Sequence, residues 1–192
     1  MRIPNSRWAY IAPTYKMSKN IAWDLIKQYS KIVPGIEYNE AELTVKYPNG
    51  SKLTLYGADN PDSLRGVGLW GVVFDEYSQQ PSNVFSEIIR PALVDHNGYA
   101  IWIGTPKGQN EFYRLYEKGK TEQNWLSLLL TVKDTDLISN IELEDAKSSM
   151  TNDEFSQEFM CSFNAAIKGA IYSKELEMAR MAKPGNDPLL PD

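Results

Sequence analysis

The sequence has very few of the residues that build disulfide frameworks and zinc sites. Its 192 residues include one cysteine, Cys161, and one histidine, His96. A lone cysteine excludes an internal disulfide, and structural zinc sites use several cysteines and histidines. The sequence also lacks an apolar run long enough to span a bilayer, and its first residues do not follow a signal-peptide pattern. We therefore expect a cytoplasmic protein with no membrane segment and no structural zinc.

Basic residues are not in excess, because the formal net charge is −5. This composition argues against a protein that binds nucleic acid with its whole surface. The charge is uneven, however. Residues 1–31 carry six basic side chains and one acidic one, whereas residues 133–158 carry eight acidic and two basic ones. The basic end has two interpretations, a solvated surface, which is the commoner case, or a contact with a polyanion.

Apolar patterns predict alternating strands and helices, which is typical of an α/β fold with a mainly parallel sheet. We expect a strand at residues 7–13, ended by Pro13, followed by a helix with an apolar face formed by Ile21, Ala22, Leu25, Ile26 and Tyr29. Further buried strands are expected at residues 69–74, 99–103 and 125–130. Helices are expected at residues 81–90, where Pro91 should break the helix, and at 109–118, 141–150 and 151–159.

A β-hairpin is the clearest local prediction. Residues 43–47 and 53–56 alternate between apolar and polar side chains, and Asn49-Gly50 between them supplies the positive φ angles of a tight turn. Because these strands look half-exposed, we expect the hairpin to decorate the sheet rather than to form its centre.

Two adjacent carboxylates follow the apolar run at residues 69–74, and they are the main candidates for chemistry. Asp75 and Glu76 should stand at the edge of the sheet where ligands of α/β proteins bind. This is the pattern of a Walker B motif, in which Asp holds Mg²⁺ and Glu orients the attacking water. The same pattern also occurs at the solvated start of an ordinary loop, so both interpretations stay open on this motif alone.

Two further polar segments fit the same chemistry. Arg65 stands in a glycine-containing loop ten residues before Asp75, where it is either a surface arginine or a phosphate ligand. Gly104 and Thr105 follow the strand predicted at residues 99–103, so they should lie at the same edge of the sheet as Asp75.

Five motifs, taken in this order, resemble the ATPase domain of the large terminase subunit of tailed bacteriophages, the motor that packages viral DNA. They lie at residues 8–15, 63–66, 72–76, 103–108 and 153–159. The resemblance implies a P-loop NTPase-like fold of the ASCE type. It also implies ATP as substrate, Mg²⁺ as cofactor, and a motor with double-stranded DNA, a portal protein, a small terminase subunit and other copies of the large subunit. The implied location is the host cytoplasm, at the procapsid.

The resemblance also implies a role for each candidate residue. Asp75 resembles the carboxylate that positions Mg²⁺, and Glu76 resembles the catalytic carboxylate that activates water. Arg65 resembles the arginine finger of the family. Gly104 and Thr105 resemble the motif that senses the γ-phosphate and couples hydrolysis to DNA movement.

Two parts of the family pattern are missing from these 192 residues. No GxxxxGK[ST] sequence occurs, so the P-loop strand and its phosphate cradle are absent. The C-terminal nuclease domain is absent as well. We therefore expect residues 1–165 to form a partial ATPase domain with a hairpin insertion, and residues 166–192 to be a linker toward the nuclease domain. Alone, such a chain should hydrolyse ATP weakly or not at all.

Two other functions remain open at this point. One is a catalytically silent remnant that acts only as an interaction module, which the missing P-loop favours. The other is a helicase-like ATPase core, in which Asp-Glu also follows an apolar strand. Strand separation by an extended chain would favour the helicase, and hydrolysis stimulated by duplex DNA would favour the packaging motor.

Overall fold

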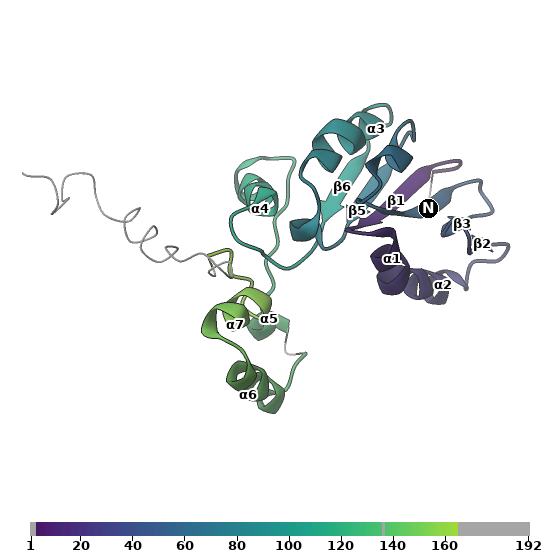
Figure 1. Cartoon of the computed structure of the whole chain (residues 1–192). Helices are drawn as coiled ribbons and strands as arrows, with labels where there is room; N and C mark the ends of the chain where they lie inside the picture. Colours follow the sequence, from purple (N-terminus) through teal and green to yellow (C-terminus); the bar gives the residue numbers. More distant parts are fainter. Residues whose placement is uncertain (1–2, 136, 165–192) are drawn as a thin grey trace, which may run out of the picture. The chain divides into compact units, whose positions relative to one another are not determined.

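The computed structural model of the protein describes residues 3–135 and 137–164 (Figure 1). The chain divides into two compact units, Met1–Thr105 and Pro106–Asp192. The linker predicted at residues 166–192 lies outside the described residues.

The first unit is built on one six-stranded sheet with the order β2-β3-β4-β1-β5-β6. Strand β1 pairs in parallel with β4 and β5, and β5 pairs in parallel with β6, whereas β2, β3 and β4 are antiparallel neighbours. The predicted α/β fold with a mainly parallel sheet is confirmed. The strands are β1 (Arg7–Ala12), β2 (Glu37–Asn39), β3 (Thr44–Lys46), β4 (Lys52–Gly57), β5 (Gly71–Phe74) and β6 (Tyr99–Trp102).

The centre of the sheet is apolar on both faces, as expected for inner parallel strands. Ile11 of β1 and Phe74 of β5 face each other in register and are fully buried. The outermost strand β6 is different, because Tyr99 and Ile101 on one of its faces remain exposed. The inner strands β1 and β5 therefore fix the positions of the residues that follow them more firmly than β6 does.

The predicted hairpin forms between β3 and β4, with Gly50 at a φ of +82° in its turn. Its expected place at the margin of the sheet is wrong for β4. All six residues of β4 pair with β1, so β4 is an inner strand with parallel and antiparallel neighbours. The alternating pattern arose because only one face of β4 is apolar: Leu53 and Leu55 belong to the core, whereas Lys52 is exposed.

A continuous helical segment covers one face of β1, β3 and β4, as Figure 1 shows. It consists of α1 (Tyr15–Ser18), the π-helical turn η1 (Lys19–Trp23) and α2 (Asp24–Ser30), and Thr14 caps it by accepting a hydrogen bond from the Met17 amide. Trp23 is the largest buried side chain of this layer. The predicted apolar face is only partly buried, because Leu25 and Tyr29 are 50% and 73% exposed.

The opposite face of β5 and β6 is covered by a second helical layer. The π-helix η4 (Val84–Ile89) continues directly into α3 (Arg90–Val94), and Phe85 packs edge-on against Phe74 and Trp102. The prediction that Pro91 breaks the helix is wrong. Pro91 lies at the junction where the π-helical η4 gives way to the α-helical α3, and the helical segment continues through it.

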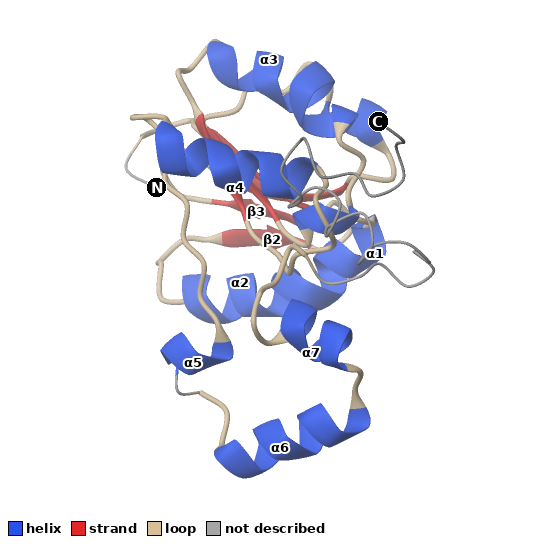
Figure 2. Ribbon diagram, turned by 90° about the vertical axis from the view of Figure 1, so that its left-hand side faces the viewer, coloured by secondary structure: helices blue, strands red, loops and turns tan. Residues whose placement is uncertain are grey.

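The second unit contains four helices among its described residues (Figure 2). They are α4 (Glu111–Thr121), α5 (Val132–Thr135), α6 (Asn140–Ser149) and α7 (Asn152–Glu158). The predicted capping box of α7 is confirmed, because Thr151 accepts a hydrogen bond from the Glu154 amide and the Glu154 carboxylate accepts one from the Thr151 amide. None of the helices in the described parts of the chain is long and apolar enough to cross a membrane.

The strand predicted at residues 125–130 does not form. Its side chains do alternate, but Leu126, Leu128 and Leu130 are exposed, and the segment pairs with no strand among the described residues. Instead Ser127 lies against α4 and donates a hydrogen bond to the carbonyl of Tyr116. A strand needs a partner for its backbone groups, and an apolar pattern does not supply one.

Candidate functional site

The candidate site lies where the parallel strands end. The carboxyl ends of β1, β4, β5 and β6 meet at one edge of the sheet, because these strands share one direction. Asp75 directly follows β5, and Gly104 comes two residues after β6. The structure thus brings these two predicted site segments to the same edge.

Hydrogen bonds hold the backbone amide and both carboxylate oxygens of Asp75. Its backbone amide donates to the carbonyl of Ile11 at 2.8 Å, which extends the pairing of β5 with β1. One carboxylate oxygen, Oδ1, accepts from the Glu76 amide at 2.9 Å, and the other, Oδ2, accepts from the hydroxyl of Tyr10. A short side chain with two fixed acceptor oxygens keeps one orientation, as a metal ligand requires.

Tyr10 is a site residue that the sequence analysis missed. It lies in β1, next to Val73 of β5, and its ring reaches along the sheet to Asp75. Burial, followed by the hydrogen bond to Asp75, raises the pKa of the Tyr10 hydroxyl, so this group stays protonated and remains a donor. The sequence signal is a hydroxyl among the apolar residues that follow Arg7 in β1.

Glu76 adopts an unusual backbone conformation. Its φ and ψ of 51° and 40° lie in the left-handed region, which glutamate rarely occupies. Its carboxylate oxygen Oε2 accepts a hydrogen bond from the Gln79 side chain at 2.9 Å. The left-handed turn ends the extended strand conformation at Glu76, so the two consecutive carboxylates do not follow the alternation of a strand.

Gly104 packs directly against the backbone of Glu76. A Cβ atom at Gly104 would lie 3.2 Å from the Glu76 Cα and 3.1 Å from the Tyr77 amide nitrogen, and the φ of +152° is itself suited to glycine. The Tyr77 amide donates to the carbonyl of Ile103 at 3.1 Å, which joins the two segments. Thr105 comes next and is half-buried. Gly104 therefore lies against Glu76 at the carboxyl edge of the sheet, the edge at which it was predicted.

Gln80 is a second residue that the sequence analysis missed. Its side-chain nitrogen donates to the carbonyl of Ile11 at 3.0 Å and to the carbonyl of Asp75 at 2.7 Å. One amide group thus bridges the ends of β1 and β5. No local sequence pattern predicts this role, because glutamine is common in exposed loops.

Arg65 is not joined to the two carboxylates by any contact within the described residues. It follows the 3₁₀ turn η2 (Pro61–Leu64), and its Nε atom forms an ion pair with the Asp62 carboxylate at 3.0 Å. Its side chain is 59% exposed. An exposed ion pair of this kind is weak, so the guanidinium is available to another partner.

The residues at this edge fit a magnesium ion that is bound mainly by phosphate. No group of three or more His, Cys, Asp or Glu side chains in the described ranges could hold a metal by itself. Mg²⁺ on a nucleotide commonly needs only one or two carboxylates, with phosphates and water completing its octahedron. Asp75 supplies one such carboxylate with a fixed orientation.

An apolar groove of about 480 Å³ opens beside Asp75. It runs between α2 and β1 and includes the exposed side chains of Ile21, Leu25 and Tyr29, with Tyr10 also in its lining. The polar edge of the site therefore adjoins an uncovered apolar surface.

Comparison with known proteins gives a consistent result. The profile of the family described as the N-terminal part of the terminase large subunit, T4likevirus type, matches residues 4–178. The terminase large subunit of Escherichia phage T5 is 30% identical over 177 residues, which is 88% of this chain and 40% of that protein. The one from Thermus virus P23-45 is 30% identical over 135 residues, which is 60% of this chain and 28% of that protein. The chain thus spans less than half the length of these relatives.

Solved structures agree with the sequence comparison. The ATPase domain of the large terminase of Thermus phage P74-26 superimposes with a TM-score of 0.72 at 25% identity, covering 83% of this chain and 77% of that one. The large terminase of a thermophilic bacteriophage, in complex with ADP, shares the fold, with a TM-score of 0.68 at 18% identity, covering 84% of this chain and 41% of that one.

Proposed function

The chain belongs to the family of phage terminase large subunits, and we propose that it forms part of the ATP-hydrolysing site of a DNA-packaging motor. The observation that carries the proposal is the arrangement at the end of β5. There Asp75 is fixed by Tyr10, and the backbone of Glu76 is turned into the left-handed region with Gly104 packed against it. Phosphoryl transfer requires such fixed charges more than it requires covalent chemistry.

Each candidate residue then has one task. Asp75 holds Mg²⁺, which offsets charge on the phosphates, and Glu76 orients the water that attacks the γ-phosphate. Arg65 leaves its exposed pair with Asp62 and stabilises the developing negative charge. Thr105, next to the Gly104 contact with Glu76, senses whether the γ-phosphate is present.

The partners of the motor follow from the family. The proposed substrate is ATP, and the proposed cargo is double-stranded DNA moved into a procapsid in the host cytoplasm. A portal protein, a small terminase subunit and further copies of the large subunit complete the assembly. The chain covers 40% of the phage T5 relative, so these activities are proposed for the assembled motor.

The experiment is ATP hydrolysis by a chain extended at its N-terminus with the upstream segment of the phage T5 relative, with and without duplex DNA. We expect Glu76→Gln to lower kcat by at least about 100-fold with little change in KM, because it removes the group that positions water. Asp75→Asn should raise the Mg²⁺ concentration needed for half-maximal activity.

Glu87→Gln is the matched control, since Glu87 is an exposed acid on η4 with no place at the carboxyl edge. Its activity should equal that of the unsubstituted chain. Unchanged hydrolysis in Glu76→Gln would contradict the proposal. Separation of DNA strands by the extended chain would indicate a helicase instead of a packaging motor.

A further inference from the structure

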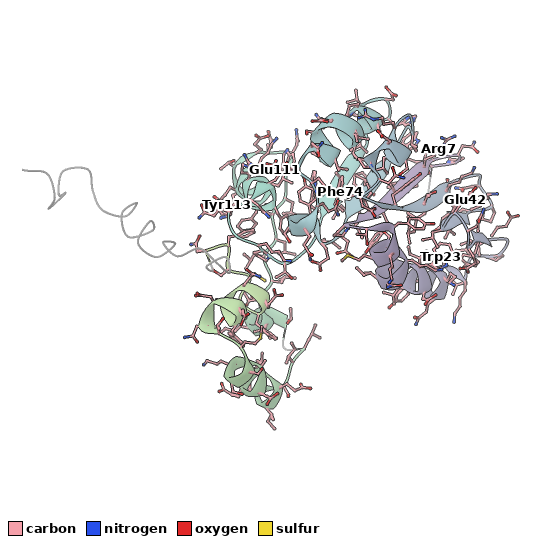
Figure 3. All side chains as sticks on the ribbon, viewed as in Figure 1. Arg7, Trp23, Glu42, Phe74, Glu111 and Tyr113 are labelled. Carbon is pink, nitrogen blue, oxygen red and sulfur yellow. The ribbon has the colours of Figure 1, made fainter. Side chains whose placement is uncertain are left out.

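The face of the sheet opposite to α1 and α2 carries a row of basic side chains. Arg7 of β1 pairs in register with Lys52 of β4, and Lys52 pairs in register with Lys46 of β3. Residues in register across neighbouring strands point to the same face, so the three side chains stand side by side about 5 Å apart. Figure 3 labels Arg7 at one end of this row, which we call the cation row.

The cation row opens into a cleft of about 610 Å³. All three side chains are exposed and line this cleft, and none of them forms an ion pair with any residue in the described ranges. Like charges directly opposite each other on a sheet are destabilising. Three of them in a protein with a net charge of −5 therefore form a surface that an anion would stabilise.

Two acidic residues limit where an anion can bind. Glu42 lines the same cleft, and Glu37 of β2 pairs in register with Lys46. Tyr56 lies on the floor of the cleft, and burial raises the pKa of its hydroxyl. The charge of Arg7 lowers this pKa and the charge of Glu42 raises it, so both charges act on the cleft. An anion must therefore lie along the Arg7 and Lys52 side, away from Glu42.

The cation row is separate from the candidate catalytic site. Arg7 and Lys52 begin β1 and β4, whereas Asp75 lies beyond the opposite ends of the parallel strands. The six residues of β1 span about 17 Å at roughly 3.3 Å per residue. A ligand on the cation row therefore does not occupy the position proposed for the nucleotide.

The aromatic side chains nearest the cation row do not offer free ring faces for base stacking. Trp8 packs edge-on against Tyr99 and donates its indole N–H to Ser6, and Tyr56 is half-buried. Tyr15 also lines the cleft and is exposed, but its backbone lies against Gly57, at the opposite end of β4 from Lys52. Beside the row the available contacts are therefore cationic and hydroxylic, including Thr54. Such groups bind a phosphate backbone without reading its bases.

We infer that the cation row binds the phosphate backbone of double-stranded DNA. This inference rests on the proposed function for the choice of duplex DNA, and the row itself supplies the charge complementarity. Duplex DNA carries one charge per roughly 1.7 Å of its axis, so neighbouring phosphates can meet neighbouring cations of the row.

The test is the affinity of the 192-residue chain for a short labelled duplex, measured by fluorescence anisotropy over a series of salt concentrations. The double variant Arg7→Gln/Lys52→Gln should reduce the slope of log affinity against log salt by about 2, since each lost phosphate contact removes about 0.9. The control Lys19→Gln/Lys31→Gln removes the same charge from exposed lysines of the helical segment on the opposite face of the sheet. It should leave the slope nearly unchanged. Glu42→Gln should act in the opposite direction and strengthen binding.

Several outcomes would overturn the inference. These are an unsubstituted chain that binds no duplex, equal losses in both double variants, or a clear preference for single-stranded DNA or inorganic polyphosphate over the duplex. Circular dichroism of each variant separates lost binding from lost folding. Loss of the DNA-binding inference would not affect the proposed function, because ATP hydrolysis is measured separately. Conversely, if Glu76→Gln left hydrolysis unchanged, duplex binding by the cation row could still be measured and tested.

Discussion

The two ends of the parallel strands are organised in opposite ways. At the carboxyl ends, hydrogen bonds fix the charged groups: Tyr10 and the Glu76 amide hold Asp75, and Gln79 holds Glu76. At the amino ends, Arg7 and Lys52 stand in register with no opposite charge paired to them within the described ranges. Chemistry on a reacting bond needs fixed atoms, whereas contact with a polymer backbone needs charge that can adjust.

The two ends also differ in whether backbone packing or exposed side chains carry their role. The carboxyl end relies on close packing of Gly104 against Glu76 and on a bridging glutamine, so it should respond strongly to small changes. The amino end relies on exposed side chains, so its substitutions should alter binding without altering the fold. Three stability measurements test this difference.

The largest effect should come from Gly104→Ala. The new Cβ would press on the backbone of Glu76 and Tyr77, and the φ of +152° is unfavourable for alanine, so we expect a loss of about 3 kcal/mol in unfolding free energy. Gly66→Ala is the matched control, because Gly66 also has a positive φ, +75°, but has open space around its Cβ position. It should cost only about 1 kcal/mol. Equal losses in urea denaturation would show that packing against Glu76 contributes nothing.

A smaller effect is expected for Tyr10→Phe. Removing the hydroxyl leaves the Asp75 oxygen without its donor and should cost about 1.5 to 3 kcal/mol at neutral pH. The pH dependence has a definite sign. Because the pKa of Tyr10 is raised in the folded protein, its contribution is complete below about pH 10, the pKa of an unfolded tyrosine, and declines above it.

The gap in stability between the unsubstituted chain and Tyr10→Phe should therefore narrow as the pH rises above about 10. Denaturation curves at several alkaline pH values measure this gap. A gap that stays constant would mean that Tyr10 ionises equally easily in both states.

The smallest effect should have the opposite sign. Lys52→Gln removes the repulsion between Lys52 and its cross-strand neighbours Arg7 and Lys46, and it should raise the unfolding free energy by a few tenths of a kcal/mol. Thermal unfolding at low salt detects this change, and added salt should abolish it. Destabilisation by the same substitution would indicate that Lys52 supports the fold rather than a ligand.

The sequence predicted those features that local patterns determine. The hairpin turn at Gly50, the capping box of Thr151 and the carboxylates after β5 all depend on neighbouring residues, and all are present. The strand predicted at residues 125–130 failed because pairing depends on a distant partner. The break predicted at Pro91 does not occur, because this residue lies where the hydrogen-bond pattern changes from π-helical to α-helical within one continuous segment.

The site was predictable in outline but not in its supporting contacts. The position of Asp75 and Glu76 follows from the end of an apolar strand, and the position of Gly104 follows from the next one. The contacts of Tyr10 and Gln80 depend on the register between β1 and β5, which no short stretch of sequence encodes. The roles of Asp75, Glu76, Arg65, Gly104 and Thr105 in binding and hydrolysis all remain predictions.

The left-handed conformation of Glu76 lowers the unfolding free energy, because glycine or asparagine would adopt the same backbone angles more easily. Selection for stability alone would drive this position toward those two residues. On the proposed role of Glu76, a carboxylate at this position gives up thermal stability in exchange for ATP hydrolysis. Variants that gain heat resistance at this position should then lose hydrolysis, and a screen for heat resistance would enrich inactive chains.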